Sequence, residues 1–206
     1  MRIAAIMRHA EPERPAPGGT RTLAAGERAA LSELGRRQCE AARAWLQGLA
    51  PVRVVASPFV RTVETARLVG APVEPELSED FAGMRLGAWE QAPAAQALES
   101  LPRLIAGELD PPPGGESIRE LGERVARAFE AAIEADGNVL IVAHRVVNAV
   151  VLAPYLGLAP EDALRVPQDH AAISLLSLDD SRDQVLALNV TPLAPLRLGR
   201  PQLEVL

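Results

Sequence analysis

Short apolar segments alternate along the chain with longer segments in which apolar residues recur every three or four positions. Continuous or alternating apolar runs predict strands at residues 2–7, 52–56, 72–75, 138–143, 172–178 and 184–190. Helical spacing predicts helices at residues 32–48, 57–68, 93–105, 116–135 and 146–156. Because strands alternate with helices, the pattern favours an α/β fold with a mostly parallel sheet.

Some local features refine this picture. In the helix at 32–48, the apolar face is predicted to hold Leu34, Ala41, Ala42, Trp45 and Leu49. Ser57 and Pro58 fit the N-cap and first turn of the next helix. The Pro- and Gly-rich residues 111–115 form a break that is too short for a domain linker. With no internal repeat in sight, we expect residues 1–206 to form a single domain.

Composition narrows the range of functions. All 21 basic residues are Arg, so a standard P-loop, a lysine Schiff base and the protein-kinase lysine are excluded. A net charge of -6 argues against nucleic acid as the main partner. It is compatible with a small anionic substrate, because a local group of Arg residues can oppose the global sign.

The sequence also bears on where the protein works. No apolar run approaches the roughly 18 residues that a membrane span needs, and charge at Arg2 and Arg8 interrupts any secretory segment. The single Cys39 cannot form an intramolecular disulfide. We therefore expect a cytoplasmic protein without a membrane partner; its oligomeric state is left open, with a homodimer among the alternatives.

The candidate chemistry lies at the ends of predicted strands. His9 follows the first strand, His144 follows the strand at 138–143, and Arg61 lies one turn into the helix after the strand at 52–56. In open α/β sheets, ligands bind beyond the carboxyl ends of the strands. With Arg8, these residues suit a phosphoryl group, because guanidinium forks match phosphate oxygens and a neutral imidazole can attack phosphorus.

Six segments resemble, in order, the motifs of the histidine phosphatase superfamily, also called the phosphoglycerate mutase-like family. Residues 8–12 resemble its Arg-His-Gly-Glu signature, 30–38 its Leu-Thr-x-x-Gly-x-x-Gln segment, and 57–66 its Ser-Pro-x-x-Arg-x-x-x-Thr-Ala block. Residues 86–90 resemble Phe-Gly-x-Trp-Glu, 113–117 match Pro-Gly-Gly-Glu-Ser, and 142–144 resemble Val-Ser-His. The resemblance covers roughly residues 2 to 178.

This resemblance implies a three-layer α/β/α sandwich and an enzyme of the small bacterial phosphatase type. It implies that His9 is a nucleophile that forms a phosphohistidine, and that Arg8, Arg61 and His144 complete a phosphate pocket. The activity would be metal-independent hydrolysis of a small phosphorylated metabolite, with no metal or organic cofactor. Arg21 is a further candidate for substrate binding.

The chain departs from the family pattern at the proton donor. The family places an acid four residues before the Gly of Gly-x-Trp-Glu, where this chain has Gly83. In another register Glu79 is the acid, and Asp80 is a neighbouring candidate; Glu90 is expected to hold the loop instead. Arg145 stands where the family usually has Gly, and could crowd the site or add an anion contact. His170 could line the substrate mouth, although a structural role is favoured.

Three functions fit these residues. The favoured one is a phosphomonoesterase, and the second is a phosphoglycerate mutase, which must retain and return the phosphate. The third is a weakly active or inactive family member that binds a phosphorylated ligand or a protein, an alternative that Gly83 keeps open. A serine hydrolase is disfavoured because residues 115–119 lack the closing Gly of a nucleophile elbow, and no paired His or Cys spacing indicates zinc.

Overall fold

The computed structural model describes residues 1–14, 28–92, 94–179 and 184–193, and in this part of the chain six strands form one sheet. The sheet order is β3-β2-β4-β1-β5-β6. The strands are β1 (Ile3–Arg8), β2 (Arg53–Ala56), β3 (Glu76–Leu77), β4 (Val139–Ala143), β5 (Ile173–Ser177) and β6 (Gln184–Val190). Neighbours from β3 to β1 are parallel, and β5 runs antiparallel to both β1 and β6. The sheet is therefore mostly parallel, as predicted.

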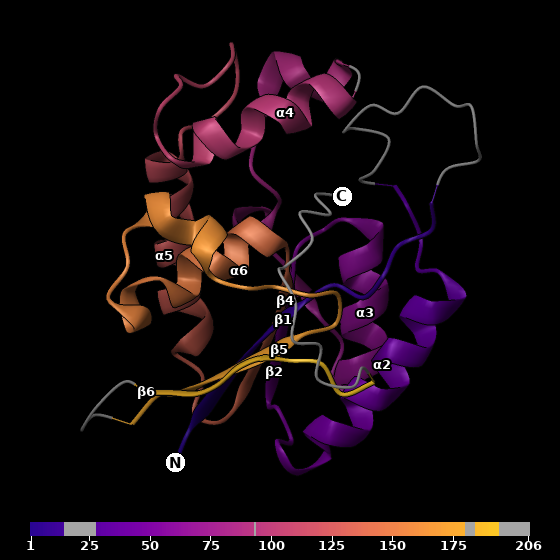
Figure 1. The fold of residues 1–206 in the computed structure, drawn as a ribbon. Helices are drawn as coiled ribbons and strands as arrows, with labels where there is room; N and C mark the ends of the chain where they lie inside the picture. The colour runs from indigo at the N-terminus through magenta and orange to yellow at the C-terminus, as the bar shows by residue number, and fades with distance from the viewer. Residues whose placement is uncertain (15–27, 93, 180–183, 194–206) are drawn as a thin grey trace.

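Helices cover both faces of the sheet. The helices are α2 (Glu33–Trp45), α3 (Val60–Gly70), α4 (Ala94–Ile105), α5 (Ile118–Ile133) and α6 (Arg145–Leu152). Short 3₁₀ turns are η1 (Leu46–Gly48), η2 (Glu79–Phe81), η3 (Gly87–Gln91), η4 (Pro154–Leu156) and η5 (Pro160–Arg165). Figure 1 shows α2 and α3 on one side of the sheet and α5 and α6 on the other, which confirms the α/β/α layering. No helix among the described residues is long and apolar enough to cross a membrane.

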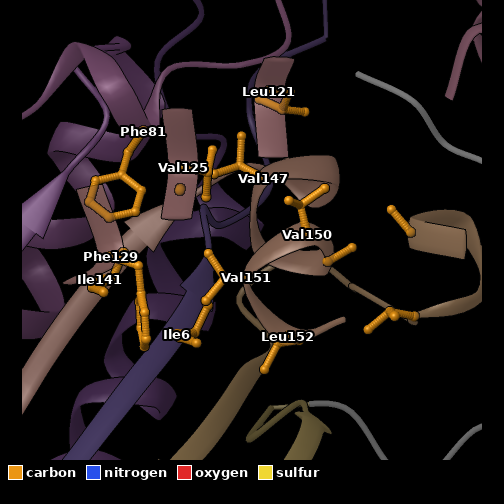
Figure 2. Packing of buried hydrophobic residues seen from close by; sticks show 14 of the residues in the cluster. Ile6, Phe81, Leu121, Val125, Phe129, Ile141, Val147, Val150, Val151 and Leu152 are labelled. Carbon is orange, nitrogen blue, oxygen red and sulfur yellow. The ribbon is translucent and has the colours of Figure 1, made fainter. Parts of the chain in front are cut away.

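The apolar runs of the central strands supply two cores, because successive side chains of a strand point to opposite faces. In β1, Ile6 packs in the cluster under α5 and α6, whereas Met7 packs in the cluster under α2 and α3. Figure 2 shows the first cluster, in which Ile6 and Ile141 meet the side chains of α5 and α6. A strand buried on both faces must be apolar at every position, which accounts for the continuous runs in the sequence.

The buried face of α2 differs from the prediction. Leu34 and Trp45 are 38% and 42% exposed, while Gly35, Cys39 and Ala42 are buried. The physical reason is close backbone approach: a Cβ added to Gly35 would lie 2.2 Å from the carbonyl oxygen of Glu11. Small residues therefore occupy the buried face of α2; of the residues predicted for that face, Ala42 and Leu49 are buried, whereas Leu34 and Trp45 are not.

Two predicted boundaries were wrong. The helix α3 begins at Val60 with Phe59 as its N-cap and no side-chain cap, so Ser57 does not cap it. The short edge strand lies at Glu76–Leu77, not at 72–75, and pairs with Val55 and Ala56. Proline lacks the N–H that a ladder needs, which explains why the strand begins only after the two prolines of 72–75.

Candidate active site

Three strand ends and one strand beginning meet at the same edge of the sheet. His9 follows β1, His144 follows β4 and N-caps α6, and Arg61 lies in the first turn of α3, after β2. Because β5 is antiparallel, the residues before it reach this edge too, and they include His170. The ring centroid of His9 lies 5.4 Å from that of His144 and 5.3 Å from that of His170. The predicted convergence of His9, His144 and Arg61 is thus what the structure shows.

The backbone around His9 is held on three sides. Its N–H donates to the carbonyl of Ala143 at 3.0 Å, and its own carbonyl accepts from the N–H of Ala171 at 3.2 Å. The next N–H, that of Ala10, donates to the hydroxyl of Thr65 at 3.0 Å. The histidine therefore has a fixed position between β4, the turn before β5, and α3.

The hydrogen bonds of His9 define its tautomer. Its Nδ1 lies 2.9 Å from the carbonyl oxygen of Ala10, and a carbonyl can only accept, so Nδ1 carries the proton. Its Nε2 accepts from Nε of Arg61 at 3.2 Å. In this state Nε2 holds a lone pair on the side of the imidazole that faces Arg61.

Electrostatics keep this imidazole neutral. His9 is only 2% exposed. Burial, followed by the positive charges of Arg61 and Arg8, lowers the pKa of His9 well below its usual value. A neutral ring at pH 7 is the form in which Nε2 can act as a nucleophile.

His144 has the opposite tautomer. A guanidinium can only donate, so the 3.3 Å contact from Nη2 of Arg61 makes Nδ1 of His144 an acceptor. Its Nε2 then carries the proton and donates to the hydroxyl of Ser57 at 2.8 Å. Burial, then the charges of Arg61 and Arg8, also lowers the pKa of His144 well below its usual value. A bound dianion would offset those charges and favour a protonated ring that donates from both nitrogens.

Arg61 and Arg8 play different parts in this geometry. Arg61 bridges the two histidines, and its guanidinium carbon lies 5.1 Å from the centre of the Phe59 ring. The buried Arg8 donates from Nη1 to the carbonyl of Gln168 at 2.7 Å and from Nη2 to Nε2 of His170 at 2.8 Å. Arg8 thus fixes the turn before β5 while adding positive charge near both central histidines.

The position of the missing acid lies beside His144. A Cβ at Gly83 would stand 3.5 Å from Cε2 of Phe59 and 3.8 Å from Cδ2 of His144, which is ordinary contact. Glu79 and Asp80 lie one turn earlier, on η2, and both are exposed. The backbone at residue 83 therefore accepts a Cβ beside His144, where this chain has no acidic side chain.

A buried ion pair holds the backbone of the segment that contains Gly83. Arg124 pairs with Glu116, and both side chains are less than one-tenth exposed. Nη1 of Arg124 also donates to the carbonyl of Asp80 at 2.7 Å, and Glu116 accepts from the N–H of Arg85 at 2.8 Å. Glu90 accepts from the N–H of Leu86 at 3.1 Å, so it holds the loop, as expected from the sequence.

Two of the predicted substrate-binding residues remain, Arg145 and Arg21. Arg145 is the first residue of α6, directly after His144, and it is half-buried. Burial lowers the pKa of its guanidinium, while the charge of Asp169 acts in the opposite direction. Arg21 lies outside the described residues.

Sequence reasoning underrated three residues of the site. Ser57 was assigned to a helix cap but bonds His144; Thr65, which binds the N–H of Ala10, was not singled out; His170 was assigned a structural role but contacts Arg8. The Ser-Pro-x-x-Arg-x-x-x-Thr-Ala block contains both Ser57 and Thr65, so the resemblance did carry a signal for them. His170 has no comparable signal.

A metal centre finds no support in the described part of the chain. There, no group of three or more His, Cys, Asp or Glu side chains is arranged to hold a metal ion. The charges available to bind an anion come from arginine.

Comparisons with known proteins agree with this geometry. The family model for the histidine phosphatase superfamily (branch 1) matches residues 4–191. No curated protein matches the sequence. A structure of the product of a Mycobacterium tuberculosis open reading frame is 25% identical with a TM-score of 0.71, covering 93% of this chain and 98% of that one.

Two further structures share the fold. A phosphoserine phosphatase from Entamoeba histolytica is 17% identical with a TM-score of 0.76, and covers 94% of this chain and 100% of its own. An alpha-ribazole phosphatase from Shigella flexneri is 21% identical with a TM-score of 0.75, and covers 95% of this chain and 100% of its own.

Proposed function

Because the chain belongs to the histidine phosphatase superfamily, we propose that it hydrolyses the phosphomonoester of a small metabolite through a phosphohistidine at His9. The observation that carries the proposal is the tautomer of His9. Its Nδ1 proton is held by the Ala10 carbonyl, so the lone pair of Nε2 lies on the side of Arg61. A phosphoryl group bound by the Arg61 guanidinium would have its phosphorus close to that lone pair.

In the first step, Nε2 of His9 attacks phosphorus and the bond between phosphorus and the ester oxygen breaks. The phosphoryl group is then on Nε2, and the leaving alkoxide takes up a proton. Positive charge that develops on the imidazole is shared with Nδ1, which keeps its proton and donates it in the hydrogen bond to the Ala10 carbonyl. Arg61, His144 and Arg8 would stabilise the charge on the equatorial oxygens.

In the second step, water attacks the phosphohistidine and the bond between Nε2 and phosphorus breaks. Inorganic phosphate leaves and Nε2 regains its lone pair. The acid that served the leaving group would act as the base toward water, and we propose Glu79 or Asp80 for this role because both precede Gly83 on the same segment. A mutase would instead return the phosphoryl group to an organic acceptor.

A panel of phosphorylated metabolites, assayed for release of inorganic phosphate, tests the proposal. The family and the geometry lead us to expect turnover of at least one alkyl phosphate. Phosphate that moves only between organic molecules would favour the mutase, and no turnover of any member would favour a binding protein.

Activity is expected to need no divalent metal. In place of a metal ion, Arg8 and Arg61 would neutralise the negative charge of the phosphoryl oxygens, because guanidinium groups are always protonated. Phosphate release should be the same, within about twofold, before and after incubation with a chelator. Loss of activity on chelation that magnesium or zinc restores would contradict this prediction.

Removing the bridging cation should slow the reaction strongly. Arg61→Gln is expected to lower kcat/KM by about 10²–10³-fold, the range for loss of one donor to a transition state. His144→Gln should cost a similar factor. Steady-state kinetics on the best substrate measures both effects, together with a thermal melt to show that each variant folds.

Arg67→Gln is the matched control, because Arg67 lies on the same helix with its side chain 62% exposed in an ion pair with Glu74. It should keep activity close to that of the parent. If Arg61→Gln behaves like Arg67→Gln, the proposed role of Arg61 is wrong.

One observation favours a second function. Gly83 supplies no acid at a place where a side chain would contact His144. If no other residue protonates the leaving group, the pocket would bind phosphorylated ligands and turn them over only slowly.

A further inference from the structure

Arg145 directly follows His144, and one nitrogen of its guanidinium lacks a hydrogen-bond partner among the residues that the structure describes. Its Nη1 atom is buried and has no hydrogen-bond partner in the described part of the chain. Asp169 is close enough to act on its charge, but the Asp169 carboxylate accepts from Nδ2 of Asn189 at 2.8 Å. A half-buried charge without a bonded partner is costly, so an arginine here calls for an explanation.

Two neighbouring amides share this property. Asn148 is fully buried, and its side-chain oxygen and nitrogen have no hydrogen-bond partner among the described residues; the same holds for Nε2 of the buried Gln168. Both lie next to pocket residues: the N–H of Asn148 donates to the carbonyl of His144 at 2.8 Å, and the carbonyl of Gln168 accepts from Arg8. Buried polar groups almost always have partners in native proteins. Asn148 lies one turn after Arg145 on α6, and Gln168 directly precedes Asp169, whose charge acts on Arg145, so these unmet groups indicate a polar occupant near Arg145.

The charges show what kind of occupant this is. In the proposed reaction, a phosphoryl dianion is met by the positive charges of Arg61 and Arg8. Arg145 then adds a third positive charge, on which the Asp169 carboxylate acts without a hydrogen bond, and a neutral leaving group would offer it no bonded partner. A second anionic group on the same substrate would match it.

We infer that the substrate carries a second anionic group, a carboxylate or a second phosphate, and that Arg145 binds it. The inference deepens the proposed function and rests on it for the position of the first phosphoryl group. It makes Arg145 a specificity-determining residue, whose contact is with the part of the substrate that leaves.

Binding measurements test this without turnover. The full-length His9→Ala protein, which should not consume its ligand, is titrated by calorimetry with phosphoserine and with phosphoethanolamine, which differ only by a carboxylate. We expect phosphoserine to bind roughly 10- to 100-fold more tightly, the range for a hydrogen bond between charged groups. Adding Arg145→Gln should abolish that difference and leave the affinity for phosphoethanolamine within about threefold.

A second pair identifies the source of the anion. Fructose 1,6-bisphosphate and fructose 6-phosphate differ by one phosphate, so selectivity in this pair alone would assign a second phosphate. Arg119→Gln is the control for total charge, because Arg119 has a side chain 78% exposed on α5. It should change neither selectivity. The thermal midpoint of Arg145→Gln should equal or exceed that of the parent, since the change removes a buried unbonded charge.

Equal affinity within both pairs would overturn the inference, as would an Arg145→Gln variant that weakens all four ligands alike. If selective binding depends on Arg145 but the wild-type protein releases no phosphate, the inference stands and the proposed hydrolase activity fails. If the protein hydrolyses phosphomonoesters but binds both members of each pair equally, the proposed hydrolase activity stands and the inference about Arg145 fails.

Discussion

His9→Ala should reduce phosphate release by roughly 10⁴- to 10⁶-fold, the scale on which loss of a catalytic nucleophile acts. The substitution removes the lone pair on Nε2. Of the two neighbouring imidazoles, His144 accepts from Arg61 at Nδ1 and His170 accepts from Arg8 at Nε2, so these two lone pairs are already engaged. Release of inorganic phosphate from the best metabolite is the measurement. Rapid acid-free quenching should also trap a base-stable, acid-labile phosphoryl group on the parent protein and none on the variant.

The variant must be shown to keep its pocket. Inorganic phosphate should still bind to His9→Ala, because the variant keeps Arg61 and Arg8, the two cations proposed to bind the phosphate. Turnover at the parental rate in a folded His9→Ala protein would end the hypothesis that His9 is the nucleophile.

The combined change Glu79→Gln and Asp80→Asn should lower hydrolysis of an alkyl phosphate by roughly 10²–10⁴-fold, the usual contribution of a positioned acid. The reason is the high pKa of an alcohol, which makes departure without a proton slow. With p-nitrophenyl phosphate, whose leaving group is stable as an anion, the same change should cost much less. The ratio of the two rates separates loss of the acid from loss of the pocket.

Gly83→Glu provides the opposite arm of this experiment. A Cβ at residue 83 has ordinary contact distances to Phe59 and His144, so the backbone there accepts a side chain, and we expect the variant to fold. If Glu79 and Asp80 are dispensable and Gly83→Glu accelerates alkyl phosphate hydrolysis, the parent lacks a donor. Slow turnover of activated aryl esters alone would then favour the binding function.

Local pattern was enough to predict the edge at which the site lies. The continuous apolar runs before His9 and His144 are those of strands buried on both faces, and parallel strands bring their carboxyl ends together. Arg61 was placed by the same argument, although α3 begins at Val60 and not at residue 57.

The hydrophobic pattern did not predict the direction of β5. An antiparallel β5 places the residues before it, not those after it, at the ligand edge, and so brings His170 to Arg8. Side-chain alternation is the same for either direction, so the sequence could offer His170 only as a candidate for the substrate mouth and could not place it beside Arg8. Likewise, the apolar period of α2 could not show that Gly35, and not Leu34, approaches the backbone of Glu11.

The place of β1 in the sheet has a consequence for biosynthesis. Of the six described strands, β1 is translated first, yet its partners are β4 and β5, which come last but for β6. Throughout most of translation, this apolar strand therefore lacks both of its native partners, and unpaired apolar strands of this kind are prone to aggregate. His9, which follows β1, consequently takes up its position only when β4 and β5 have joined the sheet, so a chain terminated before β5 cannot assemble the site.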